Sequence, residues 1–162
     1  MKMALSPTLR HRLDVQGYTC ADDATLARTQ LWLRLSPALC ATIAAAGTAL
    51  ASPAILWGLM IFAALGAVLT FHPFDLLYNA GIRHLVRGPK LSPNGAPRRF
   101  ACAVAAVWLL ATGALFAADA TVAGYLLGGA LVAVAALITV SHICIPSLIY
   151  RALFGRADLV RE

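Results

Sequence analysis

Six consecutive residues near the end of the chain combine several groups that can do chemistry. From His142 to Ser147 the sequence reads HICIPS, which contains an imidazole, a thiol, a proline and a hydroxyl. Imidazole and thiolate bind transition or soft metals, and a thiolate can also carry sulfur. Pro146 frees the carbonyl oxygen of His142 from its helical hydrogen bond and bends the helix beside Cys144. This stretch is therefore a candidate site in a bent helix.

Further thiols and imidazoles recur in the other apolar segments of the chain. The candidate ligand or metal cluster consists of Cys40, His72, Cys102, His142 and Cys144. With a helical rise of about 1.5 Å per residue, these groups fall within a slab roughly 10–15 Å thick. The alternative is that the cysteines are small hydrophobic residues and the histidines lie at a membrane boundary. No catalytic residue is predicted, because neither C-x-x-C nor H-x-x-x-H spacing is present.

The composition decides what kind of helices carry these groups. The 162 residues are 60% hydrophobic and 12% charged, and the mean hydropathy is +0.78. Soluble domains have about 25% charged residues. Four apolar runs cover roughly 36–51, 54–71, 100–117 and 122–150. The prediction is an all-α membrane protein with four transmembrane helices in two hairpins.

The basic residues predict the orientation of these helices. Of the 13 Lys and Arg residues, five precede the first run, five separate the second from the third, and three follow the fourth. By the positive-inside rule, both termini and the loop 73–99 are cytoplasmic. We expect an N-terminal segment 1–35, a membrane domain 36–151 and a tail 152–162, in a bacterial inner membrane. The net charge of +6 is then a topology signal, and no nucleic-acid partner is expected.

Two interfacial helices are expected on the cytoplasmic side. One begins at Asp22 or Asp23, and the other runs from Pro73 to a stop at Gly88, with Asp75 in its first turn. The apolar face of the second is predicted to contain Phe74, Leu77, Tyr78, Gly81 and Leu85. The residues expected at the membrane surface are Trp32, Arg34, Arg83, Arg87, Arg98 and Arg99.

Small residues in the fourth run indicate close helix packing. Gly124 and Gly128 form a G-x-x-x-G pair, and Gly129 follows them. Such a face brings helix backbones together, either within the bundle or in a homo-oligomer or larger membrane complex. The lipid bilayer is the other expected partner.

Two stretches resemble a family of small bacterial membrane proteins known as domain of unknown function 4395. They are APRRFACAVA at 96–105 and HICIPSLIY at 142–150. The resemblance implies paired hairpins, a central Pro73-Phe74 segment and a cysteine-bearing end to the last helix. It also implies a link to sulfur or thiol metabolism. Many members are expected to have a second cysteine where this chain has Ser147.

Two functions therefore compete. In the first, the cysteine and histidine cluster handles a small sulfur, thiol or soft-metal species, and the cofactor is a soft metal or haem. In the second, the chain is a structural or accessory subunit without site chemistry. An enzyme is less expected, because the apolar runs hold no acidic side chain.

Overall fold

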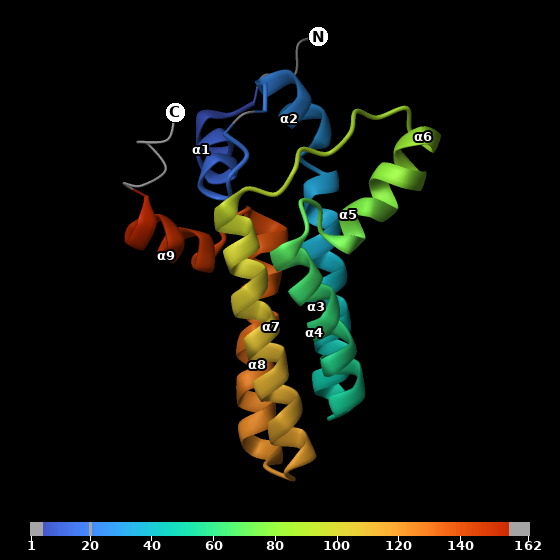
Figure 1. Cartoon of the computed structure of the whole chain (residues 1–162), viewed down its shortest axis with the longest axis vertical. Coiled ribbons are helices and arrows are strands. Elements are labelled where there is room, and N and C mark those ends of the chain that lie inside the picture. Colours follow the sequence, from blue (N-terminus) through green and yellow to red (C-terminus); the bar gives the residue numbers. More distant parts are fainter. Residues whose placement is uncertain (1–4, 20, 156–162) are drawn as a thin grey trace.

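Four long helices form the stem of the molecule. A computed structural model describes residues 5–19 and 21–155, and all regular structure in them is helical. The stem helices are α3 (Leu35–Ala49), α4 (Pro53–Val68), α7 (Ala96–Ala117) and α8 (Thr121–Ser141). They form two hairpins, α3–α4 and α7–α8, and the hairpins pack together through contacts of α4 with α7 and of α3 with α8 (Figure 1). The prediction of an all-α protein is confirmed.

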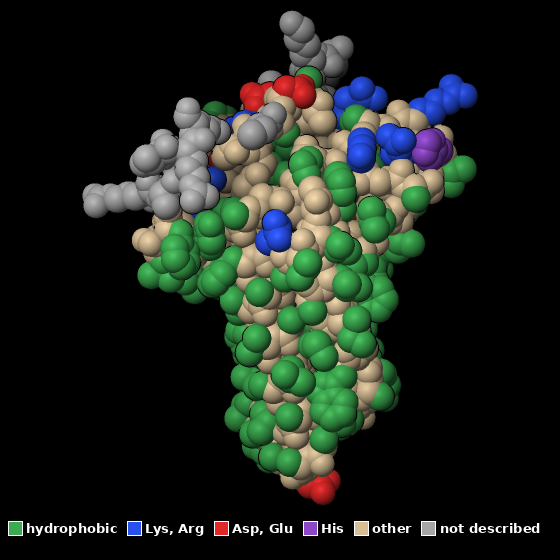
Figure 2. Space-filling model, in the orientation of Figure 1, with side chains coloured by type: hydrophobic (Ala, Val, Ile, Leu, Met, Phe, Trp, Pro, Cys, Tyr) green, Lys and Arg blue, Asp and Glu red, His purple; other side chains and the backbone are tan. Residues whose placement is uncertain are grey.

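The outer surface of the stem is apolar. By length and composition α7 and α8 can each cross a membrane, and only 22% and 17% of their most apolar stretches are buried inside the protein. α3 and α4 are too short to cross a membrane alone. They are long enough only if the segment Asp23–Thr29 is counted with α3, across a bend of 60°, and the segment Pro73–Leu85 with α4, across a bend of 82°. The described residues therefore contain two to four candidate spans. Hydrophobic side chains cover the stem in Figure 2. Helices that are apolar on their outer faces are those of a membrane protein, because lipid is their solvent.

The shorter helices gather at one end of the stem, which we call the broad end. α1 (Pro7–Val15) and α2 (Asp23–Thr29) lie there, opposite the two hairpin tips (Figure 1). Asp22 caps α2 by accepting a hydrogen bond from the backbone N–H of Thr25 at 2.9 Å, so the predicted helix start is confirmed. The helix does not continue into α3. A short turn at Trp32–Arg34 and the 60° bend come between them.

The segment after α4 is an arm of three short helices that leaves the stem sideways. They are α5 (Pro73–Leu77), a π-helical turn η2 (Tyr78–Ile82) and α6 (Arg83–Leu85). The predicted single apolar face is wrong: Phe74 and Tyr78 are buried, but Leu77 and Leu85 are 56% and 86% exposed. Leu77 is exposed within α5 itself, before the π turn. Leu85 follows that turn, whose wider i→i+5 winding moves later residues off the line that an α-helix would follow.

The fourth apolar run is not one helix. We expected it to reach Tyr150, but α8 ends at Ser141 and α9 (Ile145–Phe154) begins after a break. His142 adopts a left-handed conformation with φ 57°. Pro146 causes the break, because it has no N–H and its ring clashes with the carbonyl group four residues earlier. α9 therefore runs across the broad end instead of extending α8 (Figure 1).

The glycines of α8 have different surroundings. A Cβ added at Gly124 would lie 2.7 Å from the Phe116 ring, and one at Gly128 would lie 2.5 Å from the Thr48 hydroxyl. A Cβ at Gly129 would meet nothing within 4 Å. Gly124 and Gly128 thus let helices of the same chain approach closely. Gly129 remains free for a contact outside the chain.

Alanine substitutions at the two adjacent glycines test this difference. Gly128→Ala forces α8 away from α3, and we expect a loss of about 1–3 kcal/mol in the free energy of unfolding. Gly129→Ala adds a methyl group in open space and removes backbone freedom, so a gain of about 0.5–1 kcal/mol is expected. Thermal unfolding in detergent measures both. Equal effects of the two substitutions would contradict the packing described here.

Candidate functional site

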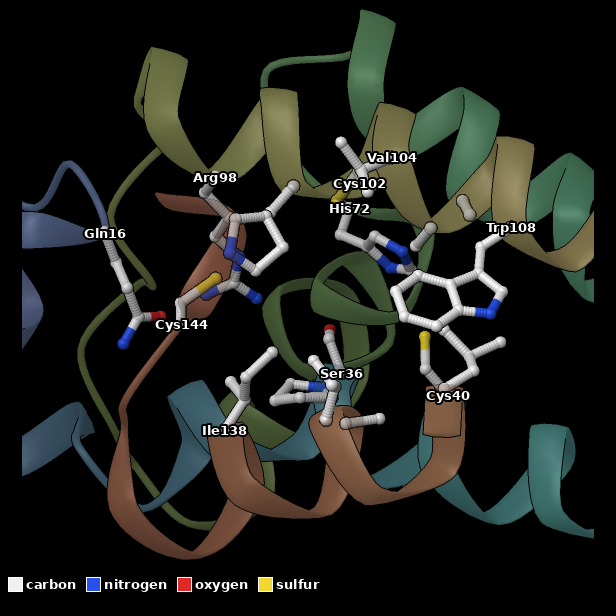
Figure 3. Close-up of a pocket in the computed structure, with 18 residues that line it drawn as sticks. Gln16, Ser36, Cys40, His72, Arg98, Cys102, Val104, Trp108, Ile138 and Cys144 are labelled. Carbon is white, nitrogen blue, oxygen red and sulfur yellow. The ribbon is translucent and has the colours of Figure 1, made fainter. Parts of the chain in front are cut away.

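A small cavity lies between the two hairpins at their broad end. Its volume is about 130 Å³, and it is lined by Cys40 from α3, Cys102 from α7, Cys144 from the break before α9, and His72 from the start of α5 (Figure 3). Four of the five predicted cluster residues therefore share one cavity. Most of the remaining lining is apolar, including the side chain of Trp108.

His142 lies beside this cavity and does not line it. Its Nε2 accepts a hydrogen bond from Arg34 Nε at 2.8 Å. Burial, followed by the positive charges of Arg34 and Arg98, lowers the pKa of the His142 imidazole to about 4. The side chain is therefore neutral at physiological pH and acts as an acceptor for Arg34. Its prediction as a cluster member is wrong, because the left-handed backbone at the helix break turns it toward Arg34.

His72 presents a donor to the cavity. It caps α5, and its Nδ1 accepts a hydrogen bond from the backbone N–H of Phe74 at 3.2 Å, so in the neutral ring Nε2 carries the proton. The absence of a side chain at Gly66 makes room for this ring. A Cβ there would lie 3.0 Å from His72 Nε2 and 3.2 Å from Cys102 Sγ. The imidazole of His72 and the thiol of Cys102 therefore both occupy the space that Gly66 leaves in the cavity wall.

Cys144 occupies the N-cap position of α9 and is buried. Its sulfur lies 3.0 Å from the hydroxyl oxygen of Ser147, which also lies 3.2 Å from the carbonyl oxygen of Pro97. A hydroxyl so placed can donate to a thiolate or accept from the thiol. Ser147 is thus in direct contact with Cys144, at the position where the resemblance implied a second cysteine.

Arg98 brings a positive charge to the same cavity. We predicted it at the membrane surface, but it is 7% exposed and lines the cavity, and its guanidinium Nη2 lies 3.4 Å from Asp75 Oδ2. Asp75 lies in the first turn of α5, as the sequence predicted, and is 1% exposed. The prediction for Arg98 is wrong because both arginines lie in α7, and the rotation of this helix turns Arg98 inward and leaves Arg99 exposed. Figure 3 shows Arg98 near Cys144.

The ion pair has neutral partners on both sides. Arg98 Nη1 donates to the Tyr18 hydroxyl, and the Ser36 hydroxyl donates to Asp75 Oδ1 at 2.5 Å. Sequence reasoning missed Asp75 and Arg98 as a pair. The available signal was that the chain has only seven acidic residues, and that one of them, Asp75, follows the second apolar run while Arg98 precedes the third.

The other predicted surface residues lie outside the cavity. Arg99 is exposed and donates to the carbonyl oxygens of Ala67 and Val68 at 2.9 and 3.0 Å, which closes the end of α4. Trp32 packs on Tyr78 with ring centroids 4.9 Å apart. Arg83 is half-buried and Arg87 is exposed. Cys20 lies outside the described residues.

The cavity fits a small polar ligand better than a metal or haem. In residues 5–19 and 21–155, no three His, Cys, Asp or Glu side chains are arranged to hold a metal ion. Pockets for drug-sized molecules have roughly 300–1,000 Å³, whereas this cavity has about 130 Å³. Three thiols, the His72 N–H and the Arg98 guanidinium offer hydrogen-bond donors and soft sulfur to one small species.

The fold and the cavity define an all-helical membrane protein with a thiol-lined site between two helix hairpins. The chain belongs to the family described as domain of unknown function DUF4395, whose profile matches residues 30–154. The matched range includes all four cavity residues of the predicted cluster. No curated protein and no solved structure matches the chain.

Substitutions in the buried ion pair test its role in the fold. Arg98→Met leaves the Asp75 carboxylate buried and unpaired, and we expect a loss of about 3–5 kcal/mol in the free energy of unfolding. Replacing both residues, with Arg98→Met and Asp75→Leu, is expected to restore most of this loss, because no uncompensated charge remains. Unfolding in detergent of the single and double variants measures the coupling. Additive losses would mean that the two charges do not interact.

Proposed function

We propose that the chain is a four-span protein of the bacterial inner membrane, with both termini and the arm α5–α6 on the cytoplasmic side. Each bent helix pair then counts as one span. The distribution of the 13 basic residues supports this orientation, because none lies between the paired runs of either hairpin. The broad end, with the thiol-lined cavity, is cytoplasmic in this arrangement, and its cysteines are in a reducing compartment.

Reporter fusions test the orientation. Fusions at Pro53 and Asp119 should report the periplasm, and fusions at Asn94 and Glu162 should report the cytoplasm. Activity of a periplasmic reporter at Asn94 would rule out the proposed orientation.

We further propose that the cavity binds a small anionic sulfur species and that Cys144 carries its sulfur. The observation behind this is that three thiols from three segments line one small cavity together with Arg98 and His72. A small hydropersulfide, such as the hydrogen disulfide ion HS–S⁻, fits the volume and the charge. The guanidinium and the imidazole N–H supply donors to an anion, and such charge-assisted hydrogen bonds are the stronger ones.

Cys144 is the best placed of the three thiols to react. It lies in the helix break, at the N-cap position of α9, and lines the cavity together with Arg98. The Ser147 hydroxyl at 3.0 Å is a further donor to a thiolate. In the transfer step the Cys144 thiolate attacks the outer sulfur of a hydropersulfide RS–SH. The S–S bond of the donor breaks, RS⁻ leaves and takes up a proton as RSH, and Cys144 becomes the persulfide, so no oxidant is needed.

Sulfur loading of the purified protein tests this function. Disodium disulfide, a source of inorganic hydropersulfide, is added in detergent, in a Cys20→Ser background, and labile sulfur is measured by cyanolysis and intact mass. We expect the parent to gain one sulfur atom and Cys144→Ser to lose this gain. Arg98→Lys, which keeps the charge but loses the planar fork, should slow loading about tenfold, or about 1.4 kcal/mol.

Arg99→Gln is the matched control for Arg98. It removes a guanidinium from the adjacent residue, which is exposed and lies outside the cavity. Loading should therefore be unchanged. If the parent takes up no sulfur, or if Cys144→Ser loads as well as the parent, the thiol site is refuted and the accessory-subunit function is favoured.

A further inference from the structure

A second, larger concavity lies at the broad end and is separate from the thiol-lined cavity. It has a volume of about 540 Å³ and lies between residues 27–34 and the turn 86–89 that ends the arm. We call it the arginine groove, because Arg28, Arg34 and Arg87 line it. Figure 2 shows basic side chains gathered at this end of the molecule.

The groove has a positive charge without a protein counter-charge. No acidic residue is among those that line it. In the part of the chain that the structure describes, the ion pairs involve Arg10 and Arg98, and neither Arg28 nor Arg87 donates a hydrogen bond. Arg34 uses only its Nε, on His142. Guanidinium groups that lack a carboxylate partner are well suited to a phosphate group.

The two walls of the groove are held in place by Tyr78. Its ring packs on Trp32 in one wall, with centroids 4.9 Å apart, and its hydroxyl donates to the Pro89 carbonyl in the other at 3.2 Å. Tyr78 itself is fully buried. Gly88 makes this bridge possible, because a Cβ there would collide with the Tyr78 hydroxyl. The groove is therefore preorganised and not a gap between mobile segments.

The rim of the groove is apolar. Leu31 and Val86 line it and are 67% and 47% exposed, and the neighbouring Leu85 is 86% exposed. Arg34 is followed directly by α3, whose residues are apolar. Positive charge beside exposed apolar side chains at the end of a stem helix matches the headgroup layer of a bilayer. A soluble phosphate compound would leave the apolar rim in water.

We propose that the arginine groove binds the phosphate-bearing headgroup of an anionic phospholipid. The guanidinium groups of Arg28 and Arg87 contact the phosphate, Trp32 lies at the headgroup level, and the apolar rim contacts the first part of the acyl chains. The contact fixes the arm against the bilayer surface. This lipid site is independent of the sulfur chemistry proposed for the cavity.

Native mass spectrometry of the full-length protein in mixed micelles tests the proposal. The probes are phosphatidylglycerol and phosphatidylcholine, which share acyl chains and differ in net charge. We expect preferential retention of phosphatidylglycerol, reduced about fivefold by Arg87→Gln. Lys90→Gln is the matched control, because it removes an exposed charge three residues away that does not line the groove. It should leave retention unchanged.

Further variants keep the result interpretable. Arg28→Gln acts from the opposite wall and should reduce retention as Arg87→Gln does, and thermal unfolding shows whether each variant is folded. Equal retention of the two lipids, or equal losses in Arg87→Gln and Lys90→Gln, would overturn the proposal. So would displacement of phosphatidylglycerol by millimolar inorganic phosphate at constant ionic strength, which would indicate a site for soluble phosphate.

Discussion

The buried pair of Arg98 and Asp75 is the interaction on which the broad end depends. It joins α7 to α5, and its neutral partners Tyr18 and Ser36 add the N-terminal segment and α3. Four segments far apart in the sequence therefore meet at two charges. A buried ion pair of this kind contributes little net stability, because desolvation offsets the attraction. What it contributes is specificity, since any arrangement that separated the two groups would leave a charge unpaired.

The helix break at His142 determines how the N-terminal segment attaches. Because Pro146 has no N–H, the carbonyl group of His142 has no helical partner. Gln16 Nε2 donates to that oxygen at 2.8 Å, and Arg12 donates to the Ser141 carbonyl at 2.8 Å. The break thus creates the acceptors that hold α1 over the cavity, and it places Cys144 at the start of α9. A single proline accounts for both features.

The sequence predicted the parts of this fold that follow from local patterns. The apolar runs predicted the stem helices, and Asp22 and Pro73 predicted the starts of α2 and α5. Pro146 predicted a bend near the point where α8 ends. It could not predict that Arg98 is buried, because its neighbour Arg99 has the same side chain and is exposed. Which of the two faces inward depends on the rotation of α7 against α4. The local sequence likewise gave no signal for the π turn at Tyr78–Ile82, which moves Leu85 out of register with Phe74.

The same distinction applies to the candidate site. Its cysteines and His72 were placed at one level of the bundle by counting residues along helices, and this level is correct for the cavity. His142 was placed at the same level, but its direction depended on a left-handed backbone that residue counting does not predict. Gly66 gave no signal, because its function is the space that it leaves for His72 and Cys102.

The apolar stem explains why the chemistry is confined to the broad end. Three polar side chains in the stem donate to backbone carbonyls: Trp57 Nε1 to Leu110, Trp108 Nε1 to Leu127 and the Thr112 hydroxyl to Trp108, at 3.3, 3.0 and 2.8 Å. Such bonds satisfy the donors without bringing charge into the bilayer, where an unpaired polar group is costly. The buried guanidinium group of Arg98 is stabilised by its contacts with Asp75 and Tyr18. Thiols need no such partner, so Cys40, Cys102 and Cys144 can line an apolar cavity, and they lie beside a charge at the end of the stem where Arg98 is buried.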